Sequence, residues 1–159
     1  MKNQRIHTRK QRIDALFALG KSLSNQGISN EAQSHWARYL CVLVSGFMET
    51  SVRDVFDDFA SVRSEPQVRK YVSKTIEKNR RNMKASAVIE LTEQFDSEWA
   101  NNLKVYLDDN GRKEALDSVV ELRNRIAHGE DSDISFVRIS GYYRKIVEIV
   151  DYLETQCLT

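Results

Sequence analysis

The sequence predicts an all-α protein, a bundle of five or six helices. The chain of 159 residues contains one proline and six glycines, so long helices can form without breakers. Apolar residues recur at intervals of three and four along most of the chain, which is the spacing of an amphipathic helix. The length suits one domain with a sizeable core, so we expect residues 1–159 to form a single domain, with residues 1–28 as a peripheral N-terminal helix.

The first half of the chain is expected to hold two helices. One spans roughly residues 8–25, and a much longer one follows over about 30–62, with Ser29 or Asn30 as its N-cap. The apolar stripe of the long helix rotates near Thr50, where we expect a bend or a change of packing partner.

Shorter helices are expected in the second half. A basic helix over 66–79 has Pro66 in its first turn, and Asp96 caps a helix that ends between Asp108 and Gly111. Two more helices are expected over about 112–128 and 135–156.

Composition and charge restrict the functional classes. The net charge is +1, so affinity for nucleic acid must come from local patches. Cys41 and Cys157 lack metal-ligand spacing, and Cys41 sits in an apolar run as a small buried hydrophobe. The N-terminus does not resemble a signal peptide, and the uncharged stretch from Tyr39 to Glu49 is too short to span a bilayer, so we expect a cytoplasmic protein with no membrane contact.

The most informative segment runs from Arg123 to Gly129 at the end of the expected helix 112–128. At about 100° per residue, Arg123 projects near the middle of the apolar arc, where a cation needs a partner. Glu49 is the partner we expect, and Asp54 is the alternative. His128 falls on the same side of the helix as Asn124, and Gly129 supplies the helix stop.

Each of these residues also has a plain structural interpretation. An arginine in an apolar arc can extend its head to water, and a histidine before a glycine can be a helix C-cap neighbour. Both residue types, however, also suit catalysis at a phosphodiester. Histidine transfers protons near neutral pH, and arginine offers a bidentate donor to a phosphorane.

Two stretches resemble the HEPN superfamily. Glu121–Gly129 resembles its Arg-x4-His motif, and Leu43–Glu49, with Ser45 and Glu49 one turn apart, resembles the first core helix of the RiboL-PSP-HEPN branch. The resemblance covers roughly residues 32–156 and implies a HEPN-like helical bundle. It also implies an endoribonuclease that uses no metal or other cofactor and leaves a 2′,3′-cyclic phosphate.

The resemblance assigns roles to three residues. Arg123 would stabilise the transition state, His128 would act as acid or base, and Asn124 would position His128 or the phosphate, with Ser45 and Glu49 in support. The motif holds one histidine per chain, so two imidazoles require two chains. HEPN ribonucleases are homodimers with a shared cleft, and we expect the same here.

Two basic segments could follow an RNA backbone. The N-terminal one contains Lys2, Arg5, Arg9, Lys10 and Arg12. The second contains Arg69, Lys70, Lys74, Lys78, Arg80, Arg81 and Lys84. Such runs are more often solvated helix faces. The acidic stretch Glu130–Asp133 would either repel phosphate or exclude off-target strands.

Three functions from different classes remain open at this stage. The first is an endoribonuclease that serves as a toxin or antiviral effector, controlled by an antitoxin or another regulatory protein. The second is a catalytically silent HEPN-like dimer that binds RNA or a protein, and the third is a structural module. Related toxins that are silenced by nucleotidyl transfer carry a tyrosine where this chain has Glu130, which disfavours that control.

Overall fold

The computed structural model describes residues 3–78 and 82–158, apart from the Leu158 side chain, and all its regular structure within those ranges is helical. The described residues form seven helices: α1 (Gln4–Asn25), α2 (Asn30–Arg63), α3 (Pro66–Lys78), α4 (Ala85–Glu93), α5 (Ser97–Asp108), α6 (Arg112–Ala127) and α7 (Phe136–Leu158). The predicted fold class is confirmed, and so are the caps at Ser29 and Asp96, whose side chains accept from Ala32 N and Trp99 N.

The prediction of five or six helices was wrong because it omitted α4. This helix has nine residues, and its N-cap, Lys84, makes no side-chain capping bond. Its first amide is capped from a distance instead, since Ala85 N donates to the Asp117 carboxylate of α6 at 2.8 Å. A cap supplied 32 positions away leaves no local sequence signal.

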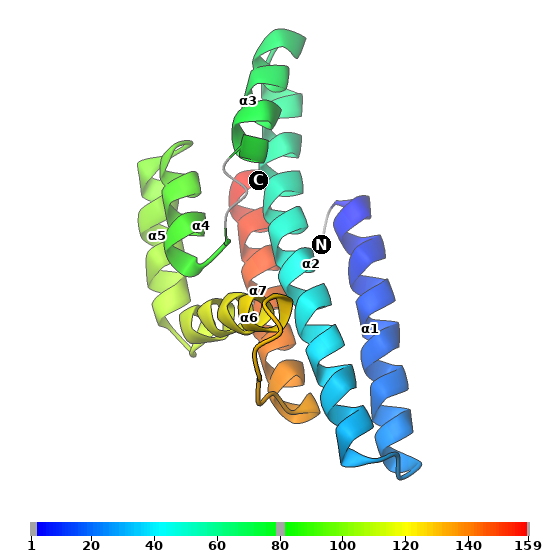
Figure 1. The fold of residues 1–159 in the computed structure, drawn as a ribbon. Coiled ribbons are helices and arrows are strands. Elements are labelled where there is room, and N and C mark those ends of the chain that lie inside the picture. The colour runs from blue at the N-terminus through cyan, green and yellow to red at the C-terminus, as the bar shows by residue number, and fades with distance from the viewer. Residues whose placement is uncertain (1–2, 79–81, 159) are drawn as a thin grey trace.

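The helices α1, α2 and α7 lie side by side and form the long body of the molecule (Figure 1). The shorter helix α6 crosses α2 and α7, while α4 and α5 form a pair that flanks the body beyond α6 (Figure 1). The core contains fully buried side chains from these helices, among them Leu40, Met48, Phe56, Leu103, Leu116, Ile146 and Leu153.

The amino-terminal helix α1 is held against α2 and α7 by packing, and against α2 also by charge. Gly20 of α1 permits a close approach, because a Cβ there would lie 2.3 Å from the Trp36 indole nitrogen and 2.8 Å from the Phe136 ring. At the other end of α1, Arg9 pairs with the buried Asp54 of α2 at 2.5 Å.

The second half of α2 extends beyond the body, and α3 folds back along it to form an arm (Figure 1). The α2 helix runs unbroken through Thr50, and beyond that residue α3 becomes one of its packing partners. Ser73 of α3 donates to the Asp57 carboxylate at 2.7 Å, which fixes the alignment of the two helices. This alignment brings the end of α3 towards the middle of α2.

Candidate functional site

The motif helix α6 ends as the sequence predicts. Gly129 adopts a left-handed backbone with φ of 71°, and its amide donates to the Ile126 carbonyl at 3.1 Å. The Glu130 amide donates to the Arg125 carbonyl at 2.9 Å, which completes a Schellman motif. His128 therefore occupies the C-cap position, immediately before the turn.

Arg123 is less buried than its place on the helical wheel predicts. Its side chain is 37% exposed, because the last turn of α6 extends past the core and leaves Ala127 exposed as well. The expected partner is close: Arg123 Nη2 lies 3.9 Å from Glu49 Oε1. Asp54 is buried elsewhere, where it pairs with Arg5 and Arg9.

Asn124 connects Arg123 to the segment before α4. Arg123 Nη1 donates to Asn124 Oδ1 at 3.0 Å, and Asn124 Nδ2 donates to Asn82 Oδ1 at 3.1 Å. The amide thus orients one edge of the guanidinium and leaves its other nitrogens free to turn towards Glu49 or a ligand. The Asn124 side chain thus contacts the Arg123 head, whereas the resemblance assigned it to His128 or the phosphate.

A pocket of about 250 Å³ opens beside the Arg123 side chain. Its lining combines residues of α2, α3 and α6 with one residue before α4: Glu49, Thr50, Arg53, Ile76, Met83 and Arg123. Arg53 was missed by the sequence reasoning, although it lies four residues after Glu49 and therefore on the same face of α2. The two guanidinium groups outnumber the single Glu49 carboxylate, so the lining carries an excess of positive charge that can attract an anion.

His128 does not line this pocket. Five residues of helix rotate it about 140° away from Arg123, and its side chain is exposed to solvent. Within the described ranges, no residue hydrogen-bonds to its imidazole. One chain therefore presents Arg123 at a pocket and His128 at an open helix end.

The supporting residue Ser45 is buried and lies one turn before Glu49 on α2. Its hydroxyl has no hydrogen-bond partner among the described residues. It does not line the Arg123 pocket, so the structure brings Glu49 but not Ser45 to the site.

The candidate RNA-binding residues divide into three groups. Arg69, Lys74 and Lys78 are exposed on α3, whereas Lys84 is partly buried at the start of α4. Arg80 and Arg81 lie outside the described residues.

The N-terminal basic segment, by contrast, is largely occupied within the chain. Arg5 Nη2 pairs with Asp58 at 2.7 Å, and Arg9 and Lys10 pair with Asp54 and Asp14.

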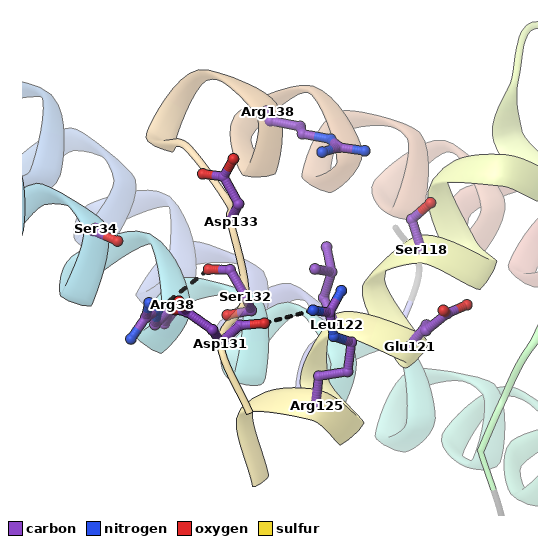
Figure 2. A pocket seen from close by; sticks show the side chains of 10 residues that line it. All are labelled: Ser34, Arg38, Ser118, Glu121, Leu122, Arg125, Asp131, Ser132, Asp133 and Arg138. Carbon is purple, nitrogen blue, oxygen red and sulfur yellow. Dashed lines mark hydrogen bonds and ion pairs between the residues drawn. The ribbon is translucent and has the colours of Figure 1, made fainter. Parts of the chain in front are cut away.

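A larger pocket, about 710 Å³, lies on the opposite side of α6 and contains neither Arg123 nor His128 (Figure 2). Arg38 and Arg125 hold the loop after His128 at its edge, and both contact Asp131. Arg38 Nη2 donates to the Asp131 carboxylate at 3.0 Å, and Arg125 Nη2 donates to the Asp131 carbonyl at 2.5 Å (Figure 2). Within the acidic stretch 130–133, the Asp131 carboxylate thus pairs with Arg38, and Glu130 Oε2 lies 3.6 Å from Arg125 Nε.

The two cysteines occupy the core. Burial raises the pKa of the Cys41 thiol to about 12, and burial likewise raises the pKa of Cys157 to about 12 against a smaller opposing effect of Arg63. Over residues 3–78 and 82–158, no group of three or more His, Cys, Asp or Glu side chains could hold a metal ion. None of the helices in those ranges combines the length and apolar character needed to cross a membrane.

Comparison with known proteins defines the class. The model of the family described as RiboL-PSP-HEPN matches residues 7–159. The chain therefore belongs to the RiboL-PSP-HEPN family and carries a HEPN-type helical domain. No curated protein and no solved structure matches the chain.

Proposed function

We propose that this protein is a metal-independent endoribonuclease whose active site is composed of Arg123, Asn124 and His128 from two copies of the chain. The observation that carries the proposal is the arrangement at the end of α6. This chain belongs to the family and has the Arg-x4-His pattern there, and Arg123 lines a pocket that contains a second guanidinium, from Arg53. We propose as well that residues 1–159 form one domain.

The reaction needs two proton transfers and one site of charge stabilisation. The 2′-oxygen of the substrate loses its proton to a base and forms a bond to the adjacent phosphorus. The bond from phosphorus to the 5′-oxygen breaks, and an acid gives that oxygen a proton. A 2′,3′-cyclic phosphate and a free 5′-hydroxyl result, so atoms and charge balance.

His128 is the residue of the motif suited to the proton transfers, since imidazole changes protonation state near neutral pH. Its exposure at the C-cap leaves both ring nitrogens accessible to a bound strand. Arg123 is suited to the phosphorane, because a planar guanidinium offers two parallel donors to two oxygens. Glu49, 3.9 Å from Arg123, would hold the guanidinium in place until phosphate competes for it.

A homodimer resolves the separation of the two groups within one chain. Arg123 and His128 point about 140° apart on α6, so one chain alone does not enclose a substrate phosphate between them. Two α6 ends that face each other would bring two histidines, one as base and one as acid, to one scissile bond.

The cellular role we propose is that of a toxin or antiviral effector that acts on cytoplasmic RNA. A separate antitoxin or regulatory protein would restrain it. Glu130, at the position where related toxins carry a modifiable tyrosine, has no hydroxyl to accept a nucleotide.

The decisive experiment incubates purified protein with mixed cellular RNA in excess chelator, beside the His128→Ala variant. We expect cleavage with cyclic-phosphate ends by the wild type and a loss of about 10²–10⁴-fold in the variant. His35→Ala is the matched control, because His35 is exposed on α2 and outside the motif.

The second candidate is a catalytically silent dimer that binds RNA or a protein. The contacts of Arg123 with Asn124 and Glu49 favour it, since they already satisfy part of the guanidinium. The second candidate replaces the first proposal if the wild type is folded and dimeric and still leaves both structured and unstructured RNA intact.

A further inference from the structure

We propose that α3 is a binding arm for single-stranded RNA, on which Tyr71 stacks against an unpaired base while lysines contact the phosphates. This inference rests on the proposed function for the identity of the ligand as RNA. It assigns the strand a place on the molecule, and it adds Tyr71, a residue that the sequence reasoning did not select.

The arm is strongly basic on its outer face. Residues 66–78 contain four cations, Arg69, Lys70, Lys74 and Lys78, and one acid, Glu77. Lys70, Lys74 and Lys78 follow one another at intervals of four, and all three are exposed. At about 1.5 Å per residue they form a row about 12 Å long, which suits successive phosphates of one strand.

An exposed aromatic ring lies within this row. Tyr71 is 72% exposed, and its position on the helix falls within about 100° of all three lysines. The Tyr71 ring therefore has no part in the core, unlike Ile76 of the same helix, whose side chain is 2% exposed. A ring flanked by positive charge is the arrangement that binds a base and its backbone together.

The arm leads towards the Arg123 pocket. Ser73 is fixed against Asp57 of α2, and one turn further along the Ile76 side chain lines the pocket with Arg53 and Arg123. Lys78 is two residues beyond Ile76, at the end of α3. The lysines lie on the opposite face of α3 from Ile76, so a strand that follows them in this direction would have to pass around the end of α3 to reach the pocket in which we place the phosphate.

The geometry favours a single strand over a duplex. Paired bases are stacked on each other and offer no free face, and a convex helix cannot enter the narrow major groove of A-form RNA. Tyr71 can stack only on a base that has left its neighbours. The arm would select unpaired RNA by its ring and hold it by charge.

The test measures binding separately from cleavage. Full-length protein carrying His128→Ala, which should not cut the probe, is titrated by fluorescence anisotropy with a 12-nucleotide single-stranded RNA. We expect a further Tyr71→Ala change to weaken binding about 5- to 150-fold, whereas Tyr71→Phe keeps it. An oligomer with the same backbone and no bases should bind equally to the protein with and without the Tyr71→Ala change.

The lysines are tested through salt dependence. Changing Lys70, Lys74 and Lys78 together to Ala should reduce the slope of log affinity against log salt by about 2, since each phosphate contact to a single strand contributes about 0.7. The charge-matched control changes three exposed lysines elsewhere, Lys21, Lys104 and Lys113, and should leave the slope unchanged.

The outcomes separate this inference from the proposed function. If wild type cleaves RNA and the Tyr71 and lysine variants bind as it does, the arm is wrong, and an acidic protein becomes the expected partner of α3. A duplex RNA of the same length is titrated in the same way. If Tyr71→Ala weakens the binding of the duplex as much as that of the single strand, the arm does not select unpaired RNA. Binding that depends on Tyr71 without any cleavage would support the arm and overturn the ribonuclease. If no RNA binds, both fail.

Discussion

Two basic segments of this chain are similar in sequence and opposite in structure. The segment near the N-terminus places Arg5 and Arg9 against Asp54 and Asp58 of α2, so its charge contributes to docking α1. The segment on α3 projects Lys70, Lys74 and Lys78 into solvent. The difference lies in what the neighbouring helix α2 offers: it supplies the carboxylates of Asp54 and Asp58 to the arginines of the first segment, whereas it meets α3 through the hydrogen bond from Ser73 to Asp57 and leaves the α3 lysines in solvent. A basic run can therefore fix one helix to another or remain available as a binding surface, according to what faces it. We call the contacts of Arg5 and Arg9 with Asp54 and Asp58 the clamp.

The largest expected effect comes from Arg123, whose guanidinium lines the pocket in which we place the phosphate. Arg123→Lys keeps the charge and removes the bidentate fork, so we expect RNA cleavage to fall about 10²–10³-fold. The matched change Arg9→Lys, in the clamp, should leave the turnover number unchanged. Both are measured on the same RNA, after circular dichroism has verified that each variant is folded. A turnover of Arg123→Lys equal to that of wild type would remove Arg123 from the chemistry.

Removing the Asp54 carboxylate from the clamp should destabilise the fold. Asp54 has a side chain 4% exposed and interacts with both Arg5 and Arg9. We expect Asp54→Ala to lower the free energy of unfolding by about 2 kcal/mol, less than for a fully buried pair because both arginines can still reach water. Denaturant titration at neutral pH measures it.

The control for this stability prediction is Asp57→Ala on the same helix. Its carboxylate accepts a hydrogen bond from Ser73 and faces the arm instead of α1. A loss of about 1 kcal/mol is expected there. Equal losses for the two variants would mean that burial of Asp54 adds nothing to the docking of α1.

The sequence predicted most of this fold because its signals are local. The caps at Ser29 and Asp96 and the stop at Gly129 act within a few residues, and the structure has all three. The start of α4 could not be predicted, because its capping carboxylate comes from Asp117 on another helix. The clamp was missed for the same reason, since no local pattern connects Arg9 to Asp54.

The candidate site was predictable only in part. The family motif selects Arg123, Asn124 and His128, but the wheel placed Arg123 inside the core because it assumed that the apolar arc is covered along the whole helix. Coverage depends on where α6 crosses α2, which is a tertiary property. Arg53 lines the pocket because α6 crosses α2 at this point. Its spacing from Glu49 indicates a site only once Arg123 is known to lie opposite.

Arg53 and Arg63 test whether an arginine that lines the pocket contributes more to RNA binding than one engaged elsewhere on the same helix. Since it lines the Arg123 pocket, Arg53→Ala should raise KM for RNA about 10-fold, which corresponds to the loss of one charge-assisted hydrogen bond, with a smaller change in kcat. Arg63→Ala is the control on the same helix, because that guanidinium lies over the Phe59 ring, 4.5 Å from its centre, and does not line the pocket. Steady-state kinetics on one RNA distinguishes the two. An unchanged KM for Arg53→Ala would leave Arg123 as the phosphate contact from this pocket.

The smallest effect is expected within the clamp itself, where Arg5 and Arg9 share Asp54. The Arg5 side chain is 54% exposed and lies 3.4 Å from Asp54, whereas Arg9 is 32% exposed and pairs at 2.5 Å. Exposed pairs contribute little, so Arg5→Ala should cost less than about 1 kcal/mol and the cost should shrink as salt is raised. Arg9→Ala should cost more and respond less to salt, because the Arg9 side chain is itself less exposed and lies closer to the shared Asp54 carboxylate. Unfolding titrations at low and high salt measure both variants. If the two arginines prove equal, exposure does not decide the strength of the clamp, and α1 is held mainly by the packing of Trp36 and Phe136 around Gly20.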